Sequence, residues 1–287
     1  MDILLKIINW VKTEDSIRTI ILTGSRAEKT ISDDLSDYDI NIFCDDIEPY
    51  IQKDQWISSI ENMWVYISEK RFFNNKLYPT RLVIFKNGIK VDFTFFTNDV
   101  LNNLVKKPSL PDEFNIGYKI LLDKDNITKN LKTPSYEGFK TQKPSEKEFL
   151  YLIDEFWFEV YHIAKYLKRK DLWSAKFRDS DIKSRLLIKM IEWNMASKHN
   201  WNYTTHHIGK KMNNWVDDNI WNDCFKIFAH FNTKDSWEKL FNMINLFRTL
   251  SKETSKNCGF HYPYQLDENI TNFITDLHKK NIKNKKA

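Results

Sequence analysis

The chain has 287 residues, which exceeds the usual length of one domain, so we expect two domains. Charged residues make up 29% of it, the mean hydropathy is −0.56, and no apolar run approaches the ~20 residues of a membrane helix, which argues against a membrane protein. The three cysteines, Cys44, Cys224 and Cys258, are far apart and lack Cys-x-x-Cys spacing, which argues against a disulfide framework or a zinc site.

The net charge of +5 is modest, and five lysines lie within the last nine residues. Short basic runs at a terminus are usually solvated and frayed, so we predict a basic tail at 281–287 and expect no nucleic-acid partner. The N-terminal residues lack a basic segment followed by a small-residue cleavage site, and we therefore expect a cytoplasmic protein.

The first elements alternate between helix and strand. Apolar residues recur at helical spacing within 2–13, which predicts an amphipathic helix. The run 20–23 has the composition of a strand and leads into Gly-Ser-Arg at 24–26, a polar link, and a second strand over 37–43. This strand, turn and strand form the segment around which the rest of the chain is organised.

Two aspartates in the second of these strands predict a metal site. Side chains alternate between the faces of a strand, so Asp37 and Asp39 are expected on one face, as ligands for the divalent metal that nucleotidyl transfer requires. A turn that opens a helix presents free N–H groups and a positive dipole end to phosphate. We therefore predict that Gly24, Ser25 and Arg26 contact the nucleotide. The alternative is an ordinary turn beside a solvated edge strand.

A hairpin farther along the chain supplies a third carboxylate. The β-rich runs 82–85 and 89–95 are separated by an Asn-Gly turn, which is a strong hairpin signal. Asp92 shares one face of the second run with Lys90, while the other face is strongly apolar. An isolated strand aspartate usually faces solvent. Beside two predicted metal ligands, however, we expect Asp92 to face the same site.

The pattern changes after a polar stretch with proline and glycine at 126–144. Before it, we expect a helix at 56–63, a short strand at 64–67, a helix at 99–104 and a strand at 118–125. After it, a capping box at Ser145 and Glu148 begins a helix, and helical patterns follow at 180–198, 216–231, 236–255 and 266–280. We therefore predict an α+β protein, with a mixed β-sheet flanked by helices in 1–135 and an α-helical bundle in 145–280.

Specific motifs resemble a known family. Gly24-Ser25-Arg26 followed by Asp37-Tyr38-Asp39-Ile40 resembles the signature of the polymerase-β-like nucleotidyltransferases. Further motifs resemble one branch, the aminoglycoside 6-adenylyltransferases or streptomycin adenylyltransferases, over nearly the whole chain. These motifs are Val91-Asp92, Leu122-Asp123-Lys124-Asp125, Asp154-Glu155-Phe156-Trp157, Ala164-Lys165, Lys189-Met190-Ile191-Glu192-Trp193, Gly209-Lys210, Leu246-Phe247-Arg248 and His261-Tyr262-x-Tyr264.

The resemblance implies a reaction and its cofactor. Enzymes of this family transfer AMP from ATP to the 6-hydroxyl of streptomycin with Mg²⁺, release pyrophosphate and inactivate the antibiotic. By resemblance, Asp37 and Asp39 would ligate the metal and Ser25 would contact phosphate. Asp92 would either ligate metal or accept the proton of the substrate hydroxyl.

The resemblance also implies that the helical domain closes over the nucleotide. Lys165 and Lys210 are the candidates for the triphosphate. Glu155 and Asp154 are the candidates for binding the cationic aminoglycoside, with Glu155 as an alternative base. Asp179 and Asp181 could add to an acidic pocket.

Other functions stay open at this stage. The acceptor could be another antibiotic, an RNA end or a protein, or the chain could be a nucleotide-binding protein without catalysis. The three carboxylates argue against the last alternative. We expect a monomer, with a dimer as the alternative.

Overall fold

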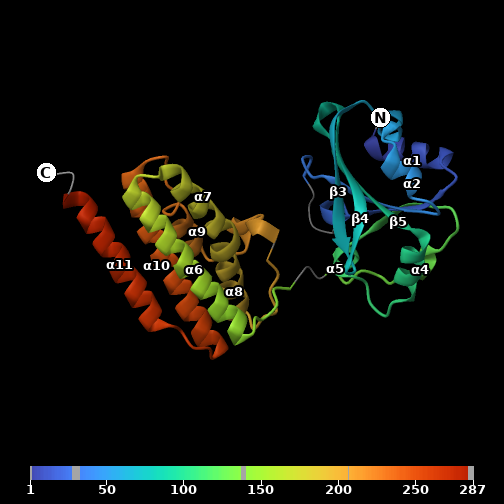
Figure 1. Ribbon diagram of the computed structural model, residues 1–287. Coiled ribbons are helices and arrows are strands. Elements are labelled where there is room, and N and C mark those ends of the chain that lie inside the picture. Colours follow the sequence, from blue (N-terminus) through green and yellow to red (C-terminus); the bar gives the residue numbers. More distant parts are fainter. Residues whose placement is uncertain (1, 28–32, 137–139, 206, 284–287) are drawn as a thin grey trace. The chain divides into compact units, whose positions relative to one another are not determined.

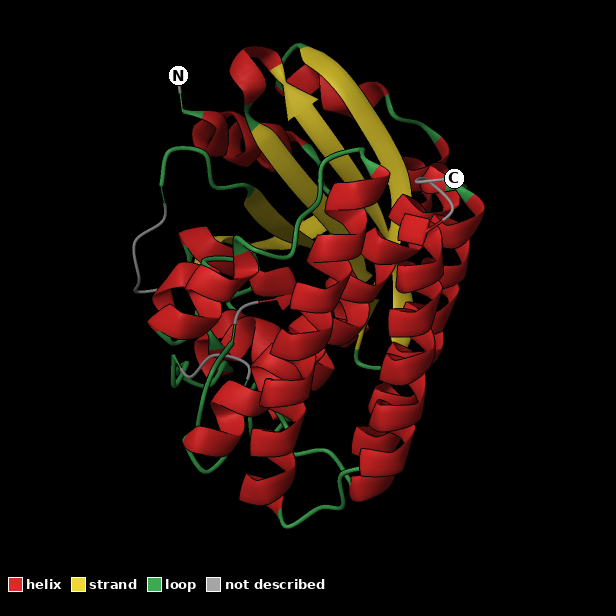
Figure 2. Ribbon diagram, turned by 90° about the vertical axis from the view of Figure 1, so that its left-hand side faces the viewer, coloured by secondary structure: helices red, strands yellow, loops and turns green. Residues whose placement is uncertain are grey.

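The computed structural model describes residues 2–27, 33–136, 140–205 and 207–283, and the chain divides into two compact units, Met1–Gly138 and Phe139–Ala287 (Figure 1). Among the described residues, all strands belong to the first unit, and the second unit is helical (Figure 2). The predicted α+β class is therefore confirmed. Of the predicted basic tail, residues 284–287 lie outside the described residues, whereas the last helix continues to Lys283.

A six-stranded mixed sheet forms the centre of the first unit, in the order β3-β4-β5-β2-β1-β6. Its strands are β1 (Ile17–Thr23), β2 (Tyr38–Cys44), β3 (Met63–Phe73), β4 (Lys76–Phe85), β5 (Lys90–Thr97) and β6 (Lys119–Asp123). Strands β2 and β5 pair in parallel, and the other neighbours are antiparallel. The predicted hairpin is confirmed as β4 and β5, joined by a turn in which Asn87 and Gly88 have positive φ.

Helices cover both faces of this sheet. On one face, α1 (Ile3–Thr13), α2 (Glu48–Gln52) and α3 (Gln55–Ile60) pack their apolar side chains, among them the stacked Trp10 and Trp56, on the sheet. On the other face, α4 (Asn98–Lys106) and α5 (Asp112–Asn115) contribute the second apolar cluster. Because both faces are covered, the central strands are buried on both sides.

The parallel strands β2 and β5 change from polar to apolar along one face. Three pairs of residues stand side by side there: Asp39 with Asp92, Asn41 with Thr94, and Phe43 with Phe96. The phenylalanine rings stack at a centroid distance of 5.2 Å, and the middle pair is buried. The two carboxylates therefore lie where the strands begin, at the polar end of a face whose other end is core.

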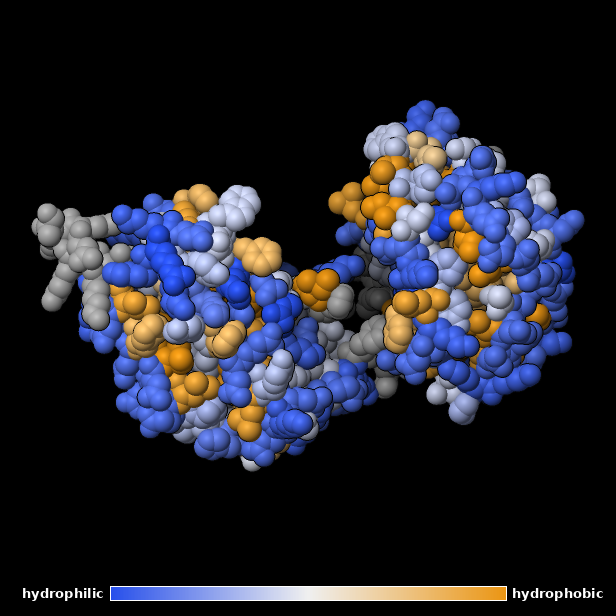
Figure 3. Space-filling model, viewed as in Figure 1, coloured by the Kyte–Doolittle hydropathy of each residue, from blue (hydrophilic) through white to orange (hydrophobic). Residues whose placement is uncertain are grey.

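Strand β3 is much longer than the short strand predicted at 64–67. It continues through the polar run 68–71, which looks like a loop in sequence but pairs with β4. A sheet edge exposes side chains to water on both faces, so its pattern is not the alternation of a half-buried strand. The side chains of Trp64, Ile67 and Phe72 on this strand are exposed. Figure 3 shows more generally that apolar residues lie among hydrophilic ones at the surface.

The second unit packs its helices around one apolar core. The helices are α6 (Glu146–Arg169), α7 (Leu172–Ile182), α8 (Ile188–Lys198), α9 (Asp218–Cys224), α10 (Thr233–Cys258) and α11 (Tyr264–Lys283). Helix α6 contacts α7, α10 and α11, which lie beside it in Figure 1. The predicted capping box at Ser145 and Glu148 is confirmed at the start of α6.

The helix predicted at 56–63 ends at Ile60, and two helices of the second unit also differ from those predicted. Helix α7 begins at Leu172 and joins α8 through a π-helical segment, Lys183–Leu187, whereas the sequence suggested one helix from residue 180. The expected helix 216–231 is limited to α9, Asp218–Cys224. In α7 the exposed aromatic residues Trp173 and Phe177 obscure the apolar stripe that marks a helix facing a core.

A buried ion pair connects α10 to α11. Arg248 donates hydrogen bonds to both carboxylate oxygens of Asp267, at 2.6 to 3.0 Å, and the hydroxyl of Tyr262 donates to the same carboxylate at 2.8 Å. Asp267 is only 5% exposed. Arg248 and Tyr262 belong to the late motifs that carry the family resemblance, and here they stabilise the helical unit.

We predict that Asp267→Asn destabilises this unit by roughly 3 kcal/mol, because Arg248, whose side chain is 22% exposed, would lose its counter-charge. Burial opposes ionisation of Asp267, but the bonds from Arg248 and Tyr262 outweigh it and lower its pKa. The contribution of Asp267 is therefore present above the ordinary carboxyl pKa and is lost as the pH falls through the lowered value. Urea unfolding followed by circular dichroism measures both effects.

The matched control is Glu268→Gln, which removes an exposed carboxylate from the same helix. Its free energy of unfolding should stay within about 0.5 kcal/mol of the unsubstituted protein. Equal losses for the two variants would contradict a stabilising role for the ion pair.

Candidate active site

Asp39 and Asp92 are neighbours across the parallel strands β2 and β5. Their side chains are 25% and 18% exposed, so both are accessible but largely surrounded by protein. In a parallel pair, residues in register point to the same face. The structure therefore brings these two predicted site residues together, although they are far apart in the sequence.

Lys90 links Asp92 to the third predicted carboxylate. Asp37 lies just before β2, and the ammonium group of Lys90 donates to its Oδ2 at 2.8 Å and to Oδ2 of Asp92 at 2.9 Å. Partial burial of Lys90 opposes its charge, but these hydrogen bonds outweigh it and raise its pKa above the ordinary value. Lys90 therefore stays protonated between two carboxylates.

The second cation at the site is Arg71, from the edge strand β3. Its Nη1 lies 3.5 Å from Oδ1 of Asp39. Burial raises the pKa of Asp39; Arg71 acts in the opposite direction, and the negative charges of Asp92 and Asp37 add to the rise. A further positive charge at this position would stabilise the ionised form of Asp39.

The Gly-Ser turn packs directly on Asp39. Gly24 opens a short helical turn, Gly24–Arg26, with a φ of +70°, which glycine adopts without the strain that other residues incur. A Cβ atom at residue 24 would overlap Oδ2 of Asp39. The sequence therefore needs glycine here both for the backbone conformation and for the position of the carboxylate.

Ser25 and Arg26 differ in their contacts, because the Arg26 side chain is already bonded to the protein backbone. Ser25 is half-buried in the same turn. The Arg26 side chain bonds to the backbone oxygens of Ser36, at 2.7 Å, and Asp34, and its guanidinium lies 4.0 Å from the centre of the Tyr38 ring. Arg26 thus holds the loop before β2, a role that the sequence did not indicate.

The chemistry of these donors suits a divalent cation. Carboxylate oxygens are the ligands that Mg²⁺ prefers, and Oδ1 of Asp92 is buried, with no hydrogen-bond partner among the described residues. That atom lies 2.8 Å from the Lys90 ammonium but outside hydrogen-bonding geometry. As placed, no three acidic, histidine or cysteine side chains in the described part of the chain surround one point closely enough to hold a metal ion.

In the helical unit, three of the four predicted acidic residues pair with cations. Glu155 on α6 accepts a hydrogen bond from Arg185 at 2.9 Å, and the same guanidinium pairs with Asp181 at 2.8 Å. Asp179 pairs with Lys183 at 2.5 Å. Asp154 is exposed. The structure therefore brings Glu155 and Asp181 together through one arginine.

Lys165 and Lys210 lie on separate elements. Lys165, on α6, is half-buried and contacts Tyr161, with 3.3 Å from Nζ to the hydroxyl. Lys210 is exposed in a turn, and its own backbone carbonyl accepts a hydrogen bond from the Trp215 indole at 3.0 Å. Among the hydrogen bonds and ion pairs of the described residues, none joins either lysine to Glu155.

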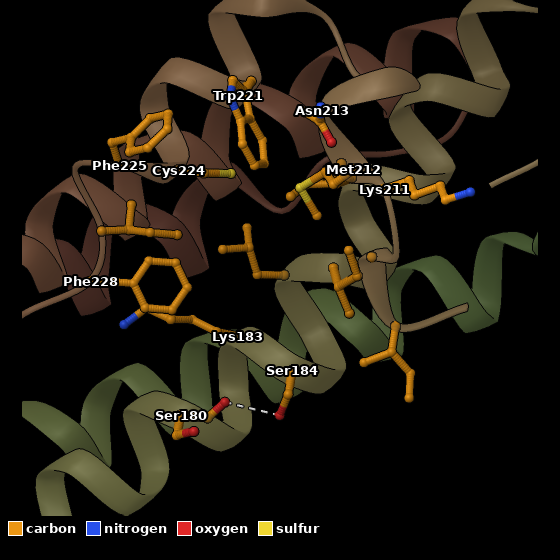
Figure 4. A pocket seen from close by; sticks show the side chains of 16 residues that line it. Ser180, Lys183, Ser184, Lys211, Met212, Asn213, Trp221, Cys224, Phe225 and Phe228 are labelled. Carbon is orange, nitrogen blue, oxygen red and sulfur yellow. Dashed lines mark hydrogen bonds between the residues drawn. The ribbon is translucent and has the colours of Figure 1, made fainter. Parts of the chain in front are cut away.

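Two cavities of the helical unit differ in character. The first, of about 680 Å³, includes Glu155, Trp193 and several lysines in its lining. The second, of about 660 Å³, is mainly apolar: Trp221, Phe225 and Phe228 face the α7 to α8 segment across it (Figure 4). The described residues that line this second cavity include two lysines and no carboxylate, so it is a poor match for a polycation.

A mixed sheet that carries paired aspartates on adjacent parallel strands, next to a Gly-Ser turn, is the arrangement of a nucleotidyltransferase. The chain has this arrangement, which defines its class of enzyme.

The chain belongs to the streptomycin adenylyltransferase family, whose model matches residues 1–277. It is 26% identical to the aminoglycoside 6-adenylyltransferase of Campylobacter jejuni, covering 96% of this chain and 94% of that protein. It is 27% identical to the enzyme of the same name from Bacillus subtilis, covering 97% and 96% of the two chains. The crystal structure of an aminoglycoside 6-adenyltransferase from Bacillus subtilis matches with 22% identity, a TM-score of 0.45 and coverage of 97% of both chains.

The contact between Gly24 and Asp39 leads to a specific prediction. Gly24→Ala should lower the transfer rate by roughly 100-fold while the protein stays folded, because displacement of a reacting group by about 1 Å costs this much. Steady-state kinetics and circular dichroism measure the two quantities.

The matched control is Gly88→Ala. Gly88 also has a positive φ, of +76°, but a Cβ atom there would meet nothing within 4 Å. Backbone strain alone would therefore affect both variants alike. If Gly24→Ala lost no more activity than Gly88→Ala, the positioning of Asp39 by the turn would be wrong.

Proposed function

We propose that the protein transfers AMP from ATP to a hydroxyl group of an aminoglycoside, the 6-hydroxyl of streptomycin, and releases pyrophosphate. The observation that carries this proposal is the pair of carboxylates, Asp39 and Asp92, held side by side against a phosphate-binding type of turn. The two relatives described above are both named aminoglycoside 6-adenylyltransferase, which supports the choice of acceptor.

Asp37 and Asp39 are the proposed metal ligands, with Asp92 as a third carboxylate that also accepts the proton of the substrate hydroxyl. Their support is the type of ligand, hard carboxylate oxygens, and their position beside the Gly24-Ser25 turn. A bound Mg²⁺ would neutralise phosphate charge and polarise the phosphoryl group under attack. The protein contributes the position of the ligands, which Gly24, Arg26 and Lys90 support through the contacts described above.

The reaction forms one bond and breaks another. The acceptor hydroxyl oxygen bonds to the α-phosphorus of ATP, the bond from this phosphorus to the bridging oxygen breaks, and pyrophosphate leaves with that oxygen. The hydroxyl proton passes to a carboxylate. Both Asp92 and Glu155 pair with a cation, but we assign this role to Asp92, because it stands in register with Asp39 beside the Gly-Ser turn.

The nucleotide contacts are assigned by residue type. Backbone N–H groups of the turn at Gly24 and the hydroxyl of Ser25 would bind phosphate oxygens, and Lys165 and Lys210 would neutralise the triphosphate. Arg26 would act mainly by holding the loop, since its guanidinium is already engaged by backbone oxygens.

Asp154 and Glu155 are the proposed contacts of the aminoglycoside amino and guanidino groups. Arg185 neutralises Glu155 in part, so the cationic acceptor would have to compete with this arginine for the carboxylate. ATP and an aminoglycoside are thus the proposed partners of a monomeric, cytoplasmic enzyme. No helix in the described part of the chain is long and apolar enough to span a membrane.

The test of this function uses radiolabelled ATP, Mg²⁺ and a panel of aminoglycosides with the purified protein. We expect label to enter streptomycin, with release of one pyrophosphate per AMP transferred. Asp39→Asn should lower this rate by on the order of 10²- to 10³-fold, because it weakens binding of the metal ion that would neutralise the phosphate charge in the transition state.

Asp99→Asn is the matched control, since Asp99 is an exposed carboxylate of the same unit, and its rate should be unchanged. Label that entered RNA or protein, but no aminoglycoside, would overturn the proposed acceptor. Near-normal transfer by Asp39→Asn would overturn the proposed metal ligand.

A further inference from the structure

Lys90 occupies a position that a metal-binding site does not require. Its ammonium lies 2.8 Å from Oδ2 of Asp37 and within 2.9 Å of both oxygens of Asp92. Strand β5 presents Lys90 and Asp92 on one face, two residues apart, and this spacing places the cation beside the carboxylate. No part of the transfer step described above uses this cation directly.

The charges at the site explain why it is there. Three carboxylates, Asp37, Asp39 and Asp92, lie near one another, and such like charges repel strongly where water is partly excluded. Lys90 pairs with two of them and Arg71 approaches the third. Without these cations the metal-free site would have three uncompensated negative charges.

The same carboxylate oxygens would bind a divalent cation. An ammonium group and a metal ion cannot both lie within bonding distance of one oxygen pair without strong repulsion. Lysine suits an exchange of this kind, because its charge is compact and its stem flexible. The Lys90 side chain is 32% exposed, so it is only partly enclosed by protein.

We propose that Lys90 is a positioning residue whose ammonium holds Asp37 and Asp92 together in the metal-free enzyme and exchanges with the divalent cation at those oxygens. This inference rests on the proposed function for the identity of the metal ligands. The exchange sets the metal affinity of the free enzyme, because binding of the cation must displace the ion pairs of Lys90.

A purely structural role for Lys90 predicts the opposite result. If the lysine only kept the carboxylates in place, its removal would disorder them, and metal binding would weaken. If the lysine competes with the metal, its removal leaves the carboxylates more negative, and metal binding strengthens. The direction of the change in affinity therefore separates the two roles.

The experiment is isothermal titration calorimetry of the full chain with Mn²⁺, without nucleotide or aminoglycoside. We expect Lys90→Met to lower the dissociation constant for Mn²⁺ by roughly tenfold, since a positive charge is removed from the site. The same variant should have a lower melting temperature than the unsubstituted protein in EDTA and a larger rise in melting temperature on addition of Mn²⁺. An unchanged or higher dissociation constant for Lys90→Met would overturn the proposal.

Two further variants complete the test. Lys86→Met removes an exposed lysine from the adjacent hairpin turn, so it matches the change in net charge, and its dissociation constant should equal that of the unsubstituted protein. Lys90→Arg keeps the positive charge, and its planar guanidinium group binds carboxylates through two parallel hydrogen bonds. It should therefore compete with the metal more strongly than lysine does and weaken Mn²⁺ binding. It also tests the proposal if Lys90→Met does not fold: unchanged or tighter binding by Lys90→Arg would overturn it.

The titration is independent of the acceptor. Failure to adenylylate any aminoglycoside would overturn the proposed function, even where Lys90→Met tightens Mn²⁺ binding. Conversely, the unsubstituted protein could adenylylate streptomycin while Lys90→Met bound Mn²⁺ with unchanged affinity. That result would overturn the proposed exchange but not the proposed function.

Discussion

The parallel pairing of β2 with β5 is the constraint on which the site depends. This pairing alone places Asp39 beside Asp92, since the two residues are joined by no local turn. Its register is maintained by the buried pairs that follow along the same face, including the stacked rings of Phe43 and Phe96. A slip of one residue would turn these side chains to the opposite face and separate the carboxylates.

Compensation of charge is the second requirement of the site. Carboxylates gathered at the start of two strands need counter-charges, and this chain takes them from Lys90 on β5 and Arg71 on β3. The helical unit follows the same rule, since Glu155, Asp179 and Asp181 each pair with a cation. Isolated buried charge is costly, so carboxylates that lose water on folding need a counter-charge nearby.

The sequence predicted features that depend on local periodicity. The amphipathic helix at α1, the β4 to β5 hairpin, the capping box of α6 and the shared face of Lys90 and Asp92 follow from spacing along the chain. It could not predict that Arg71 approaches Asp39, because that contact depends on the pairing of an edge strand whose polar sequence resembles a loop. Arg26 is a similar case: its residue type suggests phosphate, whereas its partners are backbone oxygens of a loop.

The central claim is that Asp39 and Asp92 act as one unit across the strand pair. A double-mutant cycle tests it most directly, with kcat/KM measured for Asp39→Asn, Asp92→Asn and the combined variant. Residues that act together are strongly non-additive, so the account predicts that the double variant loses about as much activity as the more damaging single variant. Losses that multiply, as for two independent residues, would contradict it.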